Sequence, residues 1–113
     1  MTIEISPLSD HTGAEVRGVD LAAPVAAATR AALNAAFTEH SVLAIRNPTL
    51  TAPQMLAAIQ LFGPVCRQHN TRFALPECPE IHYLSNQDQY EDGKRYIPGA
   101  GYHTDHSNAE EPP

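Results

Sequence analysis

The segment His103-Thr104-Asp105 has residue types and spacing suited to holding a metal ion. Residues two positions apart on a β-strand project from the same face, so a strand here would direct one imidazole and one carboxylate at a single point. These groups are two of the three ligands of a 2-His-1-carboxylate site, which holds Fe(II) and leaves positions open for a co-substrate and oxygen. We therefore take His103 and Asp105 as candidate metal ligands and catalytic residues. A histidine from elsewhere would be the third ligand.

The residues on either side of this motif favour extended chain over helix. Gly99 and Gly101 precede it, and two prolines end the sequence at 112–113. Glycine and proline disfavour a continuous helix, so the sequence predicts a strand over residues 102–108. On such a strand His106 would face away from the metal, as a solvated residue or a neighbour of the ligands.

Two helices are predicted in the first 64 residues. Pro24 fits the first turn of a helix that runs to about His40. Its apolar stripe would be formed by Val25, Leu33, Ala36 and Phe37. Thr51 and Gln54 have the spacing of a capping box, which predicts the start of a second helix that Gly63-Pro64 ends. The apolar face of that helix would carry Met55, Ile59 and Phe62.

The remaining chain predicts short strands joined by turns and loops, so the fold class is α+β. Residues 3–5 and 14–21 alternate apolar and polar residues, with a possible bulge at Gly18. Residues 42–46 predict a buried central strand closed by Asn47-Pro48, and residues 81–85 a further strand. Residues 66–80 predict a long surface loop. Residues 86–101 are polar, and Asp92-Gly93 and Pro98-Gly99 are turn signals.

Composition and charge exclude several classes of function. The formal net charge of the 113 residues is −6 and the seven basic residues are scattered, so neither nucleic acid nor a membrane surface is an expected partner. The N-terminal residues show neither a secretory signal nor a spanning segment, which makes a cytoplasmic location the default expectation. Two cysteines are too few for a disulfide framework, and we expect them to be thiols, with buried packing as the simplest role.

Four segments, taken in order, resemble the TauD/TfdA (taurine dioxygenase) family of Fe(II)- and 2-oxoglutarate-dependent dioxygenases. Residues 13–21 resemble its opening strand, residues 39–46 its first core strand, and Phe62-Gly-Pro64 the helix end that follows. Residues 102–107 (Tyr-His-Thr-Asp-His-Ser) resemble its iron-binding segment, usually written W-H-[ST]-D. The resemblance spans nearly the whole chain. Tyrosine stands here at position 102, where the family often has tryptophan.

The resemblance implies a fold and an activity. Residues 1–113 would be the N-terminal portion of one double-stranded β-helix (jelly-roll) domain, with two helices packed on the sheet. Fe(II) and the co-substrate 2-oxoglutarate would support hydroxylation of a small organic acid by molecular oxygen, with decarboxylation of 2-oxoglutarate to succinate and CO2. Family members are much longer, and their second iron histidine and 2-oxoglutarate-binding arginine have no counterpart before Pro113. We therefore expect a fragment that is inactive alone and able to self-associate as a homo-oligomer through exposed sheet edges.

Candidate substrate-side residues lie in the irregular stretch and beside the metal segment. They are His69, Asn86 and Tyr102. Each has a simpler structural interpretation: His69 as a solvated loop residue, Asn86 as the cap of a turn, and Tyr102 as ordinary core.

Two other classes of function are also compatible with the sequence. Cys66 with His69 and Cys78 with His82 form two pairs at spacings typical of a small structural zinc module. Ile81-His82-Tyr83 already fits a strand, which argues against that interpretation. The other alternative is an interaction domain without metal, in which the acidic end at Glu110-Glu111 is a solvated tail.

Overall fold

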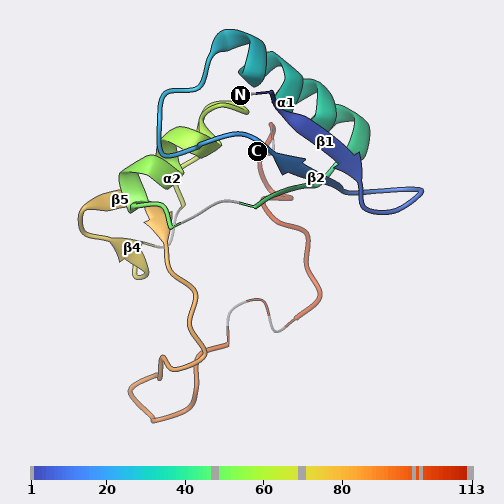
Figure 1. Ribbon diagram of the computed structural model, residues 1–113. Helices are drawn as coiled ribbons and strands as arrows, with labels where there is room; N and C mark the ends of the chain where they lie inside the picture. The colour runs from blue at the N-terminus through green and yellow to red at the C-terminus, as the bar shows by residue number, and fades with distance from the viewer. Residues whose placement is uncertain (1, 47–48, 69–70, 98, 100, 112–113) are drawn as a thin grey trace. The chain divides into compact units, whose positions relative to one another are not determined.

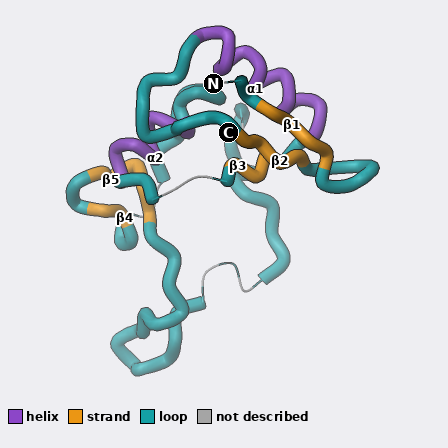
Figure 2. Tube along the Cα trace, in the orientation of Figure 1, coloured by secondary structure: helices purple, strands orange, loops and turns teal. Residues whose placement is uncertain are grey.

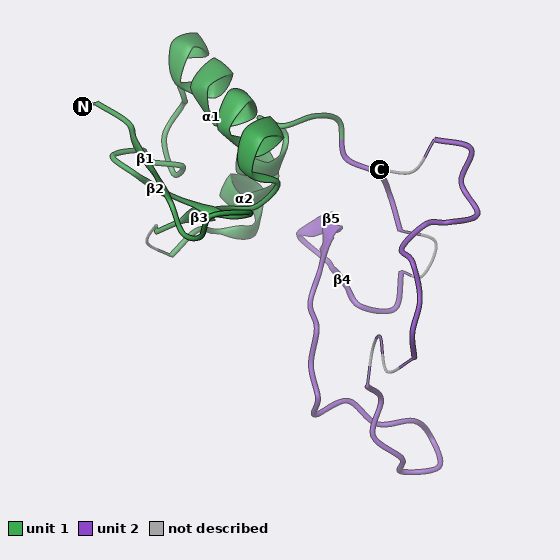
Figure 3. Ribbon diagram, turned by 90° about the vertical axis from the view of Figure 1, so that its right-hand side faces the viewer, with its two compact units in different colours: residues 1–64 green, residues 65–113 purple. Residues whose placement is uncertain are grey.

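The computed structural model describes residues 2–46, 49–68, 71–97, 99 and 101–111. The chain divides into two compact units, residues 1–64 and residues 65–113, coloured separately in Figure 3. Unit 1 contains β1 (Glu4–Pro7), β2 (Ala14–Arg17), α1 (Ala27–His40), β3 (Leu43–Ile45) and α2 (Ala52–Ile59); unit 2 contains β4 (Ala74–Leu75) and β5 (Cys78–His82) (Figures 1 and 2). Helices and small sheets together confirm the α+β class. Across the described residues, no helix combines the length and apolar character that a membrane span requires.

Unit 1 is built on a three-stranded sheet in the order β1-β2-β3. β1 is antiparallel to β2, with Ile5 opposite Val16, and β2 is parallel to β3, with Val16 opposite Ile45. The predicted strands over residues 3–5 and 14–21 are confirmed in part, the second in a shorter form. The strand predicted at residues 42–46 is confirmed as β3, but its predicted buried, central position is wrong, because β3 lies at the edge of the described sheet and is half-buried.

Gly18 explains why β2 ends early. Its φ is +76°, and a Cβ at this position would lie 2.4 Å from the backbone oxygen of Thr2. A left-handed backbone conformation interrupts the extended chain, and the close approach of Thr2 leaves no room for a side chain. The glycine therefore ends β2 at Arg17 rather than forming a bulge within a longer strand.

Helix α1 begins at Ala27, three residues later than Pro24 suggested, because the backbone of Ala26 is still extended. Ala26 is the N-cap and makes no side-chain capping bond. Leu33 and Ala36 are buried as the apolar stripe predicted, and Leu33 and Val16 are the two largest fully buried side chains described. The core of unit 1 thus joins β2 to one face of α1.

Helix α2 begins with the predicted capping box. The backbone N–H of Thr51 donates to Oε1 of Gln54 at 2.9 Å, and the N–H of Gln54 donates to Oγ1 of Thr51 at 3.4 Å. The helix ends at Ile59, before Gly63-Pro64. It ends there because the N–H of Phe62 bonds to the carbonyl of Ile59 at 3.0 Å, a three-residue spacing that tightens the last turn.

The apolar side chains of α2 line an open groove of about 370 Å³ in unit 1. Met55, Ile59 and Phe62 lie on this shared face as predicted, and Phe62 packs edge-to-face on Phe37 with ring centroids 5.5 Å apart. The other lining residues are Leu21, Leu43, Ile45, Leu50 and Ala58. Strand register accounts for the contribution of β3, because Leu43 and Ile45 pair with the buried Ala14 and Val16.

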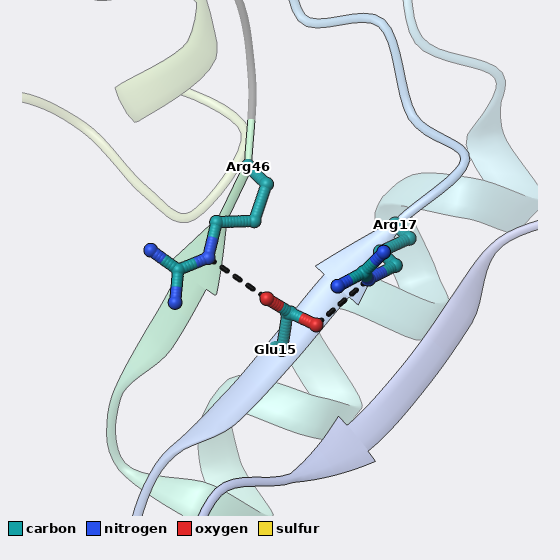
Figure 4. Close-up of polar contacts among 3 residues, drawn as sticks. All are labelled: Glu15, Arg17 and Arg46. Atoms are coloured by element: carbon teal, nitrogen blue, oxygen red, sulfur yellow. Dashed lines mark hydrogen bonds and ion pairs between the residues drawn. The ribbon is translucent and has the colours of Figure 1, made fainter.

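The other face of the sheet carries a carboxylate between two guanidinium groups (Figure 4). Arg17 Nε donates to Glu15 Oε2 at 2.7 Å, and Arg46 Nε donates to Glu15 Oε1 at 2.8 Å. Bonding first to Arg17 and then to Arg46 lowers the pKa of Glu15 below its usual value. The Arg46 pair joins β2 to the residue that follows β3, whereas the Arg17 pair lies within β2.

Replacing Glu15 with Gln is expected to lower the stability at neutral pH and to have little effect in acid. A carboxyl group stabilises the fold when its pKa is lower in the folded than in the unfolded state. The full stabilisation is present above the unfolded pKa, which is about 4.3 for Glu. It is lost as the pH falls through the folded pKa. Urea unfolding of both proteins across this pH range measures the difference. Glu39→Gln, which removes an exposed carboxylate from α1, is the charge-matched control. An equal, pH-independent difference for both variants would contradict the prediction.

Unit 2 contains a hairpin where the sequence predicted an irregular loop at residues 66–80. β4 and β5 are antiparallel, and Pro76-Glu77 forms the turn between them. The two prolines within residues 66–80 are compatible with this short, irregular pairing. In it, Leu75 lies opposite Cys78 and Ala74 lies opposite His82. The strand predicted at residues 81–85 consequently starts earlier and ends at His82.

An aromatic cluster anchors the polar segment that follows β5. The ring of Phe73 lies 5.5 Å from that of Tyr83 and 4.9 Å from that of Tyr96, between centroids. The Arg72 guanidinium lies 5.4 Å from the centre of the Phe73 ring, within cation–π range. Beyond Tyr83 the chain folds back at the predicted Asp92-Gly93 turn, where the N–H of Tyr90 donates to the carbonyl of Lys94 at 2.8 Å. The predicted turn residues Asn47, Pro48 and Pro98 lie outside the described residues.

Candidate metal centre

The candidate metal segment is irregular, so the strand predicted over residues 102–108 is wrong. Residues 102–104 have no regular secondary structure, and residues 105–108 form a turn. His106 has a φ of +50°, and the N–H of Ala109 bonds to the carbonyl of His106 at 2.9 Å. A left-handed residue cannot continue an extended strand, which explains the departure from the predicted conformation.

The two predicted ligands nevertheless converge. His103 Nε2 lies 2.9 Å from Asp105 Oδ1, which places an imidazole nitrogen beside a carboxylate oxygen. The side chains are 52% and 85% exposed, so the pair lies at the surface of unit 2. Alternation along a strand is therefore not needed to bring the pair together.

The backbone carbonyl of Gly101 sets the chemistry of the imidazole. It lies 2.7 Å from His103 Nδ1, and because a carbonyl can only accept, Nδ1 must carry the hydrogen. In the neutral ring this leaves the lone pair on Nε2, the nitrogen beside Asp105. Metal-ligating histidines commonly donate their other ring N–H to a carbonyl in this way. The donor set and the tautomer of His103 and Asp105 therefore fit a divalent metal ion.

The same contacts raise the pKa of His103. The hydrogen bond to the Gly101 carbonyl is the largest cause, followed by the negative charge of Asp105, while desolvation acts in the opposite direction. The imidazolium form is thus favoured to a higher pH than for an isolated histidine. A proton on Nε2 and a metal ion compete for the same lone pair.

The structure does not gather the other predicted site residues around this pair. Tyr102 is fully exposed, so its interpretation as ordinary core is wrong, and its role as a substrate-side residue stays a prediction. Asn86 is exposed in a bend, and its Oδ1 accepts a bond from Gln87 Nε2 at 2.8 Å, so its predicted turn cap is not seen and its substrate-side role stays a prediction. His69 lies outside the described residues. His106 Nε2 lies 3.3 Å from Gln68 Nε2, in a contact that does not involve Asp105.

Within the parts of the chain that the structure describes, no three His, Cys, Asp or Glu side chains group closely enough to hold a metal ion. The zinc set of Cys66, His69, Cys78 and His82 includes a residue outside those parts, and its two cysteines differ in environment. Cys66 is exposed and Cys78 is buried, and both are free thiols. The expectation of buried packing is therefore confirmed for Cys78 and wrong for Cys66.

No sequence signal points to the Gly101 carbonyl, because a backbone acceptor has no residue type of its own. In the sequence, Gly99 and Gly101 indicate only that the chain before His103 is not helical.

Comparison with known proteins decides the family. The family model described as "Taurine catabolism dioxygenase TauD, TfdA family" matches residues 4–113. This chain belongs to the TauD/TfdA family. The family resemblance inferred from the four segments is thereby confirmed. No curated protein matches the chain.

Solved structures agree with this TauD/TfdA assignment. A putative alpha-ketoglutarate-dependent taurine dioxygenase from Burkholderia xenovorans is 34% identical, with a TM-score of 0.69 over 79% of this chain and 32% of its own. A taurine dioxygenase from the same organism is 32% identical, with a TM-score of 0.66 over 71% of this chain and 29% of its own. AAD-2, in complex with Mn(II) and N-oxalylglycine, is 30% identical, with a TM-score of 0.54 over 57% of this chain and 23% of its own. The TauD/TfdA chain described here thus spans about a third or less of the structures it matches.

Proposed function

We propose that the full-length protein is an Fe(II)- and 2-oxoglutarate-dependent dioxygenase that hydroxylates a small organic acid. The observation that carries the proposal is the 2.9 Å approach of His103 Nε2 to Asp105 Oδ1, in a chain of the TauD/TfdA family. A related structure described as alpha-ketoglutarate-dependent and another that holds Mn(II) support the choice of co-substrate and of a divalent metal. Molecular oxygen is the remaining reactant.

His103 and Asp105 would hold the iron, and the Gly101 carbonyl would keep the proton on Nδ1 so that Nε2 is available. With 2-oxoglutarate and oxygen, bound iron supplies oxidation of a substrate C–H bond, coupled to formation of succinate and CO2. The protein residues fix the orientation of the ligands. Tyr102, Asn86 and His69 remain our substrate-side candidates.

Residues 1–113 would be the N-terminal portion of one double-stranded β-helix domain. The third iron ligand and a cation for the 2-oxoglutarate carboxylate are expected from outside residues 1–113, as the family resemblance implies for a chain that covers 32% of a related structure. The mixed sheet of unit 1, covered on one face by α1, is compatible with a place at the periphery of such a domain.

The test is Fe(II)-dependent formation of succinate from 2-oxoglutarate by the full-length protein under air. We expect turnover that requires the metal and falls by at least about 100-fold in His103→Ala, since the loss of a ligand should cost more than the 10- to 100-fold typical of residues that only support one. His106→Ala removes an imidazole three positions away, and it should retain activity. Absence of turnover from a folded, iron-loaded protein, or equal loss in both variants, would overturn the proposal.

A further inference from the structure

We propose that the apolar groove of unit 1 and the free edge of β3 form one docking surface, which a β-strand from the part of the full-length chain beyond residue 113 covers. The inference rests on the proposed function in one respect, since it takes residues 1–113 as the N-terminal portion of a longer domain. It adds the place at which that portion joins the remainder.

The groove is suited to an apolar partner. Every residue that lines it is aliphatic, aromatic or methionine. A site for an organic acid needs polar groups that fix the orientation of the ligand, and this lining supplies none from its side chains. Phe37, Met55 and Ile59 are each at least 42% exposed. A contiguous apolar surface left open in this way marks a contact with another apolar surface.

The helices beside the groove bury little of their apolar faces within the described residues. Helix α1 buries Leu33 and Ala36, and α2 buries Ala58 alone. Helices in proteins are stabilised mainly by packing an apolar face against another element. The open face of α2 therefore needs a further layer of structure.

The exposed edge of β3 supplies the polar half of the surface. Among the described strands, β2 is the only partner of β3. The carbonyl of Val42 faces β2, because it accepts from the N–H of Ala14 at 2.9 Å. Backbone groups of successive strand residues point to alternate edges, so the N–H and C=O of Leu43 and Ile45 point to the free edge. Such an edge is a template for another strand.

The two faces of β3 define the residue pattern of the strand that would pair with it. Leu43 and Ile45 line the groove. Ala44 lies on the opposite face, where it pairs with Glu15 between two arginines, so positive charge is in excess there. The added strand should therefore alternate apolar residues toward the groove with polar or acidic residues toward the arginines.

The related structures have the additional chain that such a strand requires. The match covers 32% of the putative alpha-ketoglutarate-dependent taurine dioxygenase and 29% of the taurine dioxygenase. Most of each related chain therefore lies outside the match. A strand of the same chain loses no translational freedom as a separate molecule when it docks, which favours it over a second copy.

The first experiment measures amide hydrogen exchange by NMR in the full-length protein, labelled with ¹⁵N on leucine, isoleucine and alanine. We expect exchange at Leu43 and Ile45 to be as slow as exchange at Ala44, whose N–H points toward β2. Fast exchange at Leu43 and Ile45 beside slow exchange at Ala44 would overturn the inference, since the edge would then be open. Protection that disappears on dilution would also overturn it, because a second copy would then cover the edge.

The second experiment identifies the occupant of the groove. A benzophenone-bearing phenylalanine in place of Met55 in the full-length protein should form cross-links within one molecule to a peptide beyond residue 113. The same group in place of Leu8, which is 53% exposed and does not line the groove, is the control. It should not react with that peptide. Cross-links from position 55 to unit 2 or between two copies would overturn the inference, as would equal reaction from both positions.

The two proposals fail in different ways. Absence of turnover from a full-length protein that still protects Leu43 and Ile45 would overturn the proposed function and leave the docking surface in place. Iron-dependent turnover by a protein whose β3 edge exchanges freely would overturn the docking surface alone.

Discussion

Asp105→Asn is expected to weaken Fe(II) binding by the full-length protein by more than about 100-fold, beyond the 10- to 100-fold cost typical of a residue that only supports a ligand. The amide keeps the shape of the carboxylate but removes the negative charge that offsets the charge of the metal ion. The charge is lost directly beside His103, whose Nε2 lies 2.9 Å from Asp105 Oδ1. Anaerobic calorimetric titration with Fe(II) measures the loss directly.

Asp92→Asn is the control for this substitution, because it makes the same chemical change in the same unit. Asp92 lies in the turn at Gly93 and pairs with Lys94 at 3.3 Å, a contact that involves neither His103 nor Asp105. Its variant should bind Fe(II) as the wild type does. Full affinity in Asp105→Asn would remove Asp105 from the ligand set.

Leu33→Ala is expected to lower the free energy of unfolding by about 2–5 kcal/mol, the range measured when a buried leucine is truncated. The Leu33 side chain is fully buried on α1, so truncation loses its transfer free energy and leaves a cavity. Protein stabilities are commonly about 5–15 kcal/mol, and this loss would be a large part of that total.

Urea unfolding at matched temperature compares this variant with Leu8→Ala, an identical substitution in unit 1. Leu8 is 53% exposed. Its truncation therefore loses less buried apolar area than truncation of Leu33, and it should lower the free energy of unfolding clearly less. Similar losses in both variants would show that α1 does not supply the core of unit 1.

Local sequence patterns predicted the helices of unit 1 well and its strand boundaries poorly. The capping box of Thr51 and Gln54 involves residues three positions apart, so the sequence alone contains the whole interaction. Strand ends depend on distant residues. Gly18 ends β2 because the backbone of Thr2 approaches it, and β3 lies at an edge because β2 is its only partner among the described strands.

The same distinction applies to the candidate site. The residue types at 103 and 105 and their separation predicted a pair of ligands that converge, and the side chains do converge. The predicted reason, alternation along a strand, is wrong because His106 adopts a left-handed conformation. A contact made by a backbone atom, such as the Gly101 carbonyl, has no signature in residue type.

The parallel pairing of β2 with β3 also bears on the order of folding. Ala14 pairs with Leu43, 29 positions later, and α1 lies between them. Closing so long a loop is entropically costly, whereas a helix forms from contacts between near neighbours. We expect formation of α1 to bring the segments of β2 and β3 closer together before the two strands pair. Substitutions that weaken the helix should then slow the assembly of the sheet, even where they touch neither strand.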